Sequence, residues 1–167
     1  IGLDITPAML KCGLANIKAS RMHTRIELVC ASGMNMPFAA DAFDVVICAL
    51  ATHHMDINRL LCETRRVLKK EGQLVLADVG VPSLWRSFPA NGIIRLATLL
   101  YSRTHRSARA QAEAAAVPNI RTVVEWQTIL SACGFARVEI VARFRARRLW
   151  YPGALFLKAT KASCDTG

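Results

Sequence analysis

The middle of the chain has two apolar runs on either side of an amphipathic segment. Residues 43–49 and 73–79 are rich in β-branched and aliphatic side chains, which is typical of strands covered on both faces of a parallel sheet. Residues 57–68 carry an apolar stripe at helical spacing, and the lysines and glycine of residues 69–72 are typical of a helix end. The stripe consists of Leu60, Leu61, Val67 and Leu68. Parallel strands need such a crossover helix, so the pattern predicts an open α/β sheet.

The first part of the chain predicts a strand, a helix and a second strand. Residues 1–4 have the apolar character of a strand end, and Thr6 followed by a proline is suited to begin a helix over residues 7–19. Residues 26–31 predict a short strand, and residues 32–42 predict a loop because they contain glycine, asparagine and proline. The predicted inward stripe of the helix is Met9, Leu10, Leu14 and Ile17.

Residues 81–121 are a different kind of sequence, in which aromatic and aliphatic residues mix with arginines. Because no turn signal interrupts residues 93–116, we expect a helical insertion that is apolar on one side and basic on the other. A packed helix with a solvated basic face accounts for the same pattern.

The last part of the chain predicts a helix and two strands. Thr122 and Glu125 form a capping-box pattern that begins the helix, and Gly134 ends it. Residues 137–147 alternate between apolar and charged side chains, and residues 154–161 form another apolar run, so both are predicted to be strands. Because their connection is short, the two strands should be antiparallel.

Length and charge narrow the class of protein. A chain of 167 residues with 53% hydrophobic residues is long enough for one domain with its own core. Its first residue is Ile inside a predicted strand end, which indicates a fragment. Residues 1–80 contain nine Lys and Arg and eight Asp and Glu, whereas residues 81–167 contain thirteen and four. The second part therefore carries +9 of the net charge of +10. This half either attracts anionic partners or presents a solvated surface.

The six cysteines have neither the CxxC spacing of metal and redox sites nor the density of secreted disulfide scaffolds. Most of them lie in apolar contexts, so we expect reduced thiols in or near the core of a cytoplasmic protein, and no metal site. No apolar run approaches the roughly 18 residues of a membrane span.

Asp4 is the first candidate for chemistry. An acidic residue at the carboxyl end of a strand is where an open α/β sheet commonly holds a ribose through both hydroxyls. The alternative is that Asp4 only caps the helix that follows it.

Four motifs add weight to the first interpretation. IGLDITPAML, ASGMNMPF, FDVVICALATHH and RRVLKKEGQLVLADVG have the order and spacing found in class I S-adenosylmethionine-dependent methyltransferases, and the sequence resembles in particular their quinone-biosynthesis C-methyltransferases. The resemblance implies a Rossmann-like three-layer α/β sandwich with a mostly parallel sheet and an antiparallel C-terminal strand. The family's first strand, glycine-rich loop and first helix are expected before Ile1. Residues 1–167 are then a single truncated methyltransferase domain.

The resemblance also implies S-adenosylmethionine as the cofactor. Asp4 would hold its ribose, and Ile5 would lie against one face of its adenine. Gly33 and Met34 would border the other side and offer backbone N–H groups to a ring nitrogen. The family usually has Asp where this sequence has Ser32, which can still accept a hydrogen bond from the adenine amino group, without the ionic strengthening.

The methionine end of the cofactor is expected above the loop that follows residues 43–49. Cys48, Ala49 and Leu50 would pass beneath it. His53 and His54 come next, where a base that takes a proton from the acceptor would be useful. The histidine pair could instead contact substrate or cofactor, line the pocket, or cap the helix that follows.

In the family, the region of the 81–121 insertion often forms a substrate lid. Trp85, Phe88, Tyr101 and Trp126 could line an apolar pocket for a small-molecule acceptor, with arginines for an anionic head group or for contact with a membrane surface. Nucleic acid is disfavoured because the basic residues are interleaved with aliphatic ones.

Two functions are consistent with the sequence. The first is S-adenosylmethionine-dependent methyl transfer, by in-line displacement, to a small lipophilic or anionic acceptor. The second is a catalytically inactive methyltransferase-like module, or a fragment, that binds a membrane surface or a protein through its basic second half. The series of motifs favours the first function, whereas Ser32 and the absent glycine-rich loop favour the second.

Overall fold

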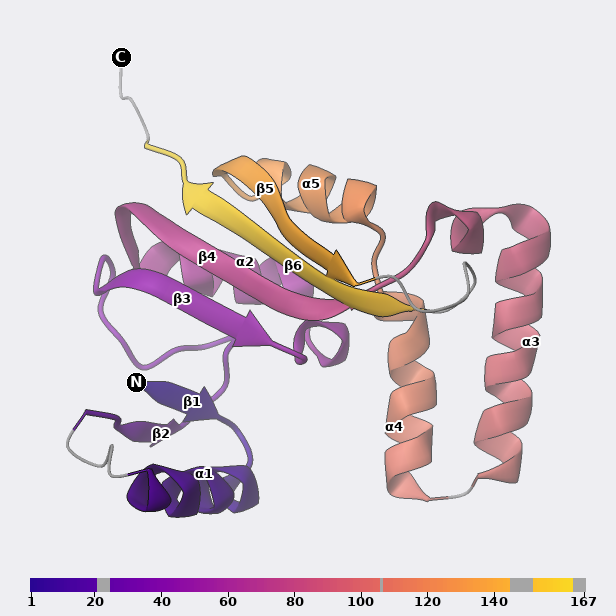
Figure 1. Cartoon of the computed structure of the whole chain (residues 1–167), viewed down its shortest axis with the longest axis horizontal. Coiled ribbons are helices and arrows are strands. Elements are labelled where there is room, and N and C mark those ends of the chain that lie inside the picture. The colour runs from indigo at the N-terminus through magenta and orange to yellow at the C-terminus, as the bar shows by residue number, and fades with distance from the viewer. Residues whose placement is uncertain (21–24, 106, 145–151, 164–167) are drawn as a thin grey trace.

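The computed structural model describes residues 1–20, 25–105, 107–144 and 152–163, and it contains two sheets flanked by helices (Figure 1). β1 (Gly2–Asp4) and β2 (Leu28–Cys30) form a parallel pair, connected by α1 (Pro7–Ala19). Both strands and the helix lie where the sequence predicts them, although β2 is shorter than the predicted strand.

The second sheet has four strands in the order β3, β4, β6, β5. β3 (Phe43–Ala49) and β4 (Leu68–Gly80) are parallel and connected by α2 (Ile57–Val67), as predicted. β6 (Gly153–Lys161) is antiparallel to both of its neighbours, β4 and β5 (Phe135–Phe144). The α/β class with parallel strands and an antiparallel C-terminal strand is therefore confirmed. Residues 145–147 of the predicted strand lie outside the described residues.

The main core lies on one face of the four-stranded sheet. α2 and α5 (Val123–Ala132) cover this face, which Figure 1 shows behind the strands. The predicted stripe of α2 is fully buried there. The largest buried side chains of the core are Leu61, Leu68, Leu74, Leu76, Trp126, Leu130 and Leu157.

The prediction that β3 is covered on both faces is wrong. Val45 is 47% exposed and Ile47 is 70% exposed. β3 lies at the edge of its sheet and pairs only with β4 among the described strands, whereas β1 pairs with β2 in the separate sheet. Val46 and Cys48 pack against the core under α2 and α5, so Val45 and Ile47, which alternate with them along the strand, lie on the other face and stay partly in solvent.

The predicted helix end at residues 69–72 is also wrong, because α2 stops at Val67 and β4 begins at once. Leu68 already pairs with Phe43, and the next pair in register is Val45 with Gln73, so residues 69–72 form a bulge. The Lys69 ammonium binds the Asp44 carboxylate at 2.9 Å across the two strands. Residues 69–72 therefore belong to a strand, because pairing with β3 outweighs a composition that favours a helix end.

The predicted inward stripe of α1 is only partly buried. Ile17 is buried, but Met9 is 60% exposed and Leu14 is 44% exposed. The helix packs on a sheet of two short strands, which is too narrow to cover a full apolar stripe.

The 81–121 insertion is helical, as predicted, and forms a hairpin that stands away from the sheet (Figure 1). It consists of η2 (Ser83–Arg86), α3 (Phe88–Thr104), α4 (Ala108–Ala116) and η3 (Val117–Asn119). Its apolar residues are less buried than a packed helix requires. Those of α3 with the largest exposure are Phe88, Ile93, Leu96 and Leu100.

The prediction of core or near-core cysteines is wrong for Cys12, Cys30 and Cys62, which are exposed. Cys48 and Cys133 are half-buried, and all five described cysteines are free thiols. Cys164 lies outside the described residues. None of the helices in the described ranges combines the length and apolar composition of a membrane span.

Candidate active site

The first part of the site lies at the carboxyl end of β1. The Asp4 side chain accepts a hydrogen bond from the Thr6 backbone N–H at 2.7 Å through Oδ1, so Asp4 does stabilise the start of α1. The other carboxylate oxygen, Oδ2, makes no hydrogen bond within the described part of the chain. Ile5 beside it is 65% exposed. Asp4 therefore combines its helix-starting contact with one oxygen that remains able to hold a ligand hydroxyl.

The turn after β2 is joined to the backbone of Asp4, because the Ala31 N–H donates to the Asp4 carbonyl at 3.1 Å. Ser32 Oγ accepts from the Met34 N–H at 3.2 Å, so this N–H, which was expected to bind adenine, has an internal partner. Gly33 is buried, and a Cβ there would lie 3.3 Å from Leu60 Cδ1. Its missing side chain lets the turn pack closely on α2.

The second part of the site is the loop after β3. Leu50 has a φ of 53° and is 67% exposed, while its N–H donates to the Ala77 carbonyl of β4 at 2.8 Å. Ala49 before it is exposed, and Cys48 is half-buried. Burial, and secondarily the charge of Asp78, raises the pKa of the Cys48 thiol to about 11. The Cys48 thiol is therefore neutral at pH 7. It is also a poor nucleophile there, because only a thiolate is a strong nucleophile.

Asp78, near the end of β4, fixes this loop through hydrogen bonds. Its buried carboxylate accepts hydrogen bonds from the Thr52 N–H at 3.0 Å, the Thr52 hydroxyl, the Val79 N–H at 2.7 Å and His53 Nδ1 at 2.9 Å. Because a carboxylate only accepts hydrogen bonds, His53 donates through Nδ1 and keeps its lone pair on Nε2. The His53 side chain is 11% exposed and that of Asp78 is 3% exposed. Asp78 thus fixes both the orientation and the tautomer of His53.

His54 lies next to His53 with a ring-centroid distance of 4.2 Å and is exposed. The His53 carbonyl accepts from Asn119 Nδ2 at 3.2 Å, which connects the loop after β3 to η3 of the hairpin. The turn after β2 and the loop after β3, which hold the two predicted groups of site residues, are also adjacent. Met55, which follows His54, lies against Gly33 in the turn.

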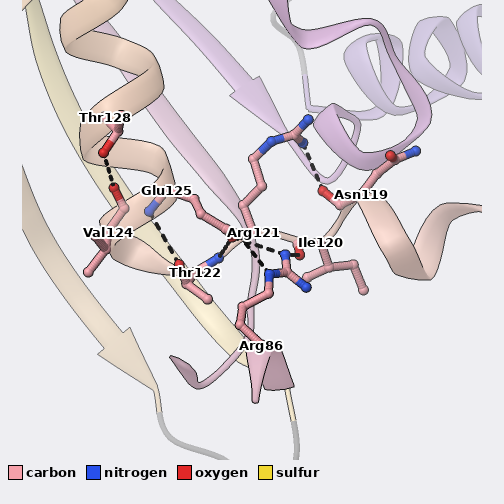
Figure 2. A network of polar contacts seen from close by, with 8 residues as sticks. All are labelled: Arg86, Asn119, Ile120, Arg121, Thr122, Val124, Glu125 and Thr128. Carbon is pink, nitrogen blue, oxygen red and sulfur yellow. Dashed lines mark hydrogen bonds and ion pairs between the residues drawn. The ribbon is translucent and has the colours of Figure 1, made fainter. Parts of the chain in front are cut away.

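A network of polar contacts fixes the base of the hairpin to α5 (Figure 2). Arg86 binds both carboxylate oxygens of Glu125, at 2.7 and 2.9 Å, and also donates to the Ile120 carbonyl at 2.7 Å. Glu125 and Thr122 complete the predicted capping box. The hydrogen bonds from Arg86 hold the pKa of the Glu125 carboxyl below its usual range. The start and the end of the hairpin are therefore tied to the same helix cap.

A cavity of about 720 Å³ lies between α3 and α4. Its walls include Trp85, Ile94 and Arg95, and it extends to Pro118, next to the asparagine that binds His53. Of the four aromatic residues predicted to line a pocket, Trp85 lines this cavity, and the other three are not among its described lining residues. Phe88 is 96% exposed and Tyr101 is 45% exposed, whereas Trp126 is 1% exposed inside the main core.

Comparison with known proteins shows which proteins the chain resembles. Residues 1–76 match the family model described as a methyltransferase domain. The chain aligns with a demethylmenaquinone methyltransferase of Listeria welshimeri at 34% identity over 84 residues, which is 50% of this chain and 35% of that protein. It aligns with a ubiquinone/menaquinone biosynthesis C-methyltransferase of Citrifermentans bemidjiense at 33% identity over 86 residues, 50% and 36% of the two chains. The matched part thus spans about a third of these relatives.

Solved structures show the same fold over almost the whole chain. The YcgJ protein of Bacillus subtilis superposes with a TM-score of 0.72 at 16% identity, covering 97% of this chain and 82% of its own. Geranyl diphosphate C-methyltransferase from Streptomyces coelicolor, in complex with Mg²⁺, geranyl diphosphate and S-adenosyl-L-homocysteine, superposes with a TM-score of 0.67 at 13% identity, covering 96% and 62%.

The fold, with its loops at the carboxyl ends of parallel strands, is one that this chain shares with solved methyltransferases, and residues 1–76 are similar to a methyltransferase domain in sequence. Half of the chain resembles the quinone-biosynthesis C-methyltransferases in sequence. The resemblance inferred from the four motifs is thereby confirmed.

Sequence reasoning missed Asp78 and Asn119 as parts of the site. Asp78 had a detectable signal, because it is a charged residue within an otherwise apolar strand and therefore needs partners. Asn119 had none, because its contact with His53 joins residues that are 66 positions apart.

The raised pKa of Cys48 predicts low reactivity toward alkylating agents. At pH 8, iodoacetamide should modify Cys48 far more slowly than the exposed Cys62, and the rate at Cys48 should rise only as the pH approaches about 11, because the neutral thiol is the stable form below that value. Peptide mass spectrometry after timed labelling measures each cysteine separately. Equal labelling rates of Cys48 and Cys62 at pH 8 would contradict the assignment.

Proposed function

We propose that this chain belongs to an enzyme that transfers a methyl group from S-adenosylmethionine to a small acceptor with an apolar body and an anionic or polar head. The observation that carries the proposal is the meeting of two features at His53. The loop expected beneath the methionine end of the cofactor runs into His53, and Asn119, which follows Pro118 in the wall of the hairpin cavity, donates a hydrogen bond to the His53 carbonyl.

The nucleoside end of the cofactor fits the residues at the ends of β1 and β2. Asp4 has a carboxylate oxygen available for the ribose hydroxyls, and Ile5 offers an exposed apolar side chain to the adenine. Ser32 already accepts from Met34, and its hydroxyl retains a proton and a second lone pair for the adenine edge. Bound S-adenosylmethionine supplies a methyl group on a sulfonium, which is transferred by in-line displacement with a neutral leaving group.

The protein's part in this chemistry is alignment and exclusion of water. Cys48, Ala49 and Leu50 form the floor of the cleft, and His53 presents Nε2 toward the acceptor, where it can accept a hydrogen bond from an acceptor hydroxyl. His54 is the exposed neighbour that contacts the polar head of the acceptor. Asp78 is a positioning residue, because it acts only by holding His53 and Thr52.

The cavity of the hairpin supports a lipophilic or anionic acceptor. Its wall combines the apolar side chains of Ile94 and Trp85 with the guanidinium of Arg95. The names of similar proteins point the same way, since they include demethylmenaquinone methyltransferases and a geranyl diphosphate C-methyltransferase.

We also propose that the outer face of α3 touches a membrane surface in the cytoplasm. This face exposes large apolar side chains on a helix that also carries arginines, a combination suited to an anionic lipid interface. The free thiols of the described cysteines support the reducing compartment.

The role of Asp4 can be tested in the full-length protein. Asp4→Ala should weaken the affinity for S-adenosylmethionine by about 1.5 to 3 kcal/mol, or about 10- to 150-fold, because a hydrogen bond to a charged group is lost. Asp44→Ala is the matched control, since Asp44 is an exposed carboxylate on β3 whose partner is Lys69. Equal affinities in both variants and the wild type would reduce Asp4 to a helix-starting residue.

The hairpin cavity can be tested with adjacent residues of α3. Ile94→Asp places a carboxylate in the wall of the cavity and should lower kcat/KM for the acceptor at least about tenfold, with cofactor affinity within a few-fold, because an unpaired charge facing an apolar ligand is costly. The control is Ile93→Asp, whose side chain is 59% exposed. Parallel loss of acceptor turnover and cofactor affinity in Ile94→Asp would indicate a general folding defect instead.

Ile93→Asp also tests the membrane contact. With a water-soluble acceptor the variant should turn over normally, whereas its sedimentation with vesicles of anionic phospholipid should fall below that of the wild type. Equal sedimentation of the two proteins would remove α3 from the membrane proposal.

A further inference from the structure

The loop after β3 and the hairpin meet at three side chains that are typical metal ligands. The ligand atoms of His53, His54 and Glu113 all lie within 4.8 Å of one another. The two histidines come from η1, and Glu113 comes from α4, which continues into η3. We propose that these residues bind one divalent transition-metal ion, with Zn²⁺ as the best-fitting species. This proposal differs from the expectation that the chain has no metal site, and none of the six cysteines takes part in it.

One of the three ligands is already oriented for a metal. His53 donates through Nδ1 to the buried Asp78 carboxylate, which leaves Nε2, with its lone pair, as the nitrogen available to a metal. A carboxylate bound to the far nitrogen of a histidine is the usual outer support of a metal-binding imidazole, because it fixes the tautomer and the ring and raises the basicity of the ligand. The further bonds of Asp78 to Thr52 and Val79 keep this support rigid.

The other two ligands are free to adjust. A tetrahedral Zn²⁺ with bonds of about 2.0 to 2.2 Å to nitrogen and oxygen places its ligand atoms about 3.4 Å apart. The separations here extend to 4.8 Å, so the ligands must draw together by up to about 1.4 Å. His54 and Glu113 are exposed and can make that movement by side-chain rotation, whereas His53 stays in place.

The ligand set identifies the kind of metal site. Two imidazoles and one carboxylate suit Zn²⁺, and a site with three protein ligands leaves a fourth position open, as in catalytic rather than structural zinc centres. Such an open position could take an oxygen atom of a bound molecule. In that state, His53 acts on the molecule through the metal, because the Nε2 lone pair cannot serve two partners.

This role at the acceptor rests on the proposed function, but metal binding does not. The test therefore uses the full-length protein without cofactor or acceptor, after treatment with EDTA and dialysis. Calorimetric titration with Zn²⁺ should show one site, and Co²⁺ should give the visible absorption of a tetrahedral centre without a thiolate charge-transfer band. The second readout excludes binding by the cysteines.

Variants of the three ligands decide the location. Asp78→Asn removes the outer support of His53 and should raise the dissociation constant for Zn²⁺ roughly 10- to 100-fold. His54→Ala and Glu113→Gln each remove a ligand and should raise that constant by at least as much. His105→Ala and Glu139→Gln, at exposed positions outside the cluster, should leave it unchanged. Circular dichroism checks that each variant is folded.

Three results would overturn the proposal. These are no binding of Zn²⁺ below millimolar concentration, a Co²⁺ spectrum that shows thiolate ligands, and equal affinities in the His54→Ala, Glu113→Gln and control variants. Failure of the metal titration would leave S-adenosylmethionine binding intact, so it is distinguishable from failure of the proposed function.

Discussion

The site depends on the buried carboxylate of Asp78. This side chain accepts four hydrogen bonds from the backbone and side chains of Thr52, His53 and Val79, all on segments at the ends of β3 and β4. A buried carboxylate without partners is costly, so the loop that supplies the donors is held in one conformation. The parallel pairing of β3 with β4 brings Asp78 beneath that loop. One interaction thus connects the sheet to the position of His53.

The hairpin is attached near this point, and at the cap of α5, by more exposed contacts. Asn119 binds the His53 carbonyl, and Arg86 binds Glu125 at the cap of α5 (Figure 2). Outside these contacts the hairpin stands away from the sheet (Figure 1) and exposes most of the large apolar residues of α3. The arrangement is that of an element fixed at its base, which suits a segment that closes over an acceptor.

Sequence patterns predicted the elements well, because local rules govern them. The bounds of β3, the crossover by α2 and the capping box at Thr122 follow from periodicity and capping chemistry. The errors occur where contacts between residues far apart in the sequence determine the structure. Strand pairing extends β4 into Lys69 and Lys70, and the edge position of β3 exposes Ile47.

The site was predictable to the extent that the motifs are contiguous in sequence. Asp4, the Ser32 turn and the loop from Cys48 to His54 could be named from the sequence, and the structure brings the two groups together through Met55. The supporting and neighbouring residues could not, because Asp78, Glu113 and Asn119 reach the histidines only through the topology of the sheet and the hairpin. Residues of a site that are contiguous in sequence can thus be predicted from it, whereas residues that only the fold brings near cannot.

We propose that these loops form the cofactor site of a methyltransferase. Calorimetric titration of S-adenosylmethionine into the full-length protein tests this proposal. We expect saturable binding of one cofactor per chain. No heat at high micromolar cofactor, with a circular dichroism spectrum that shows an intact fold, would contradict it.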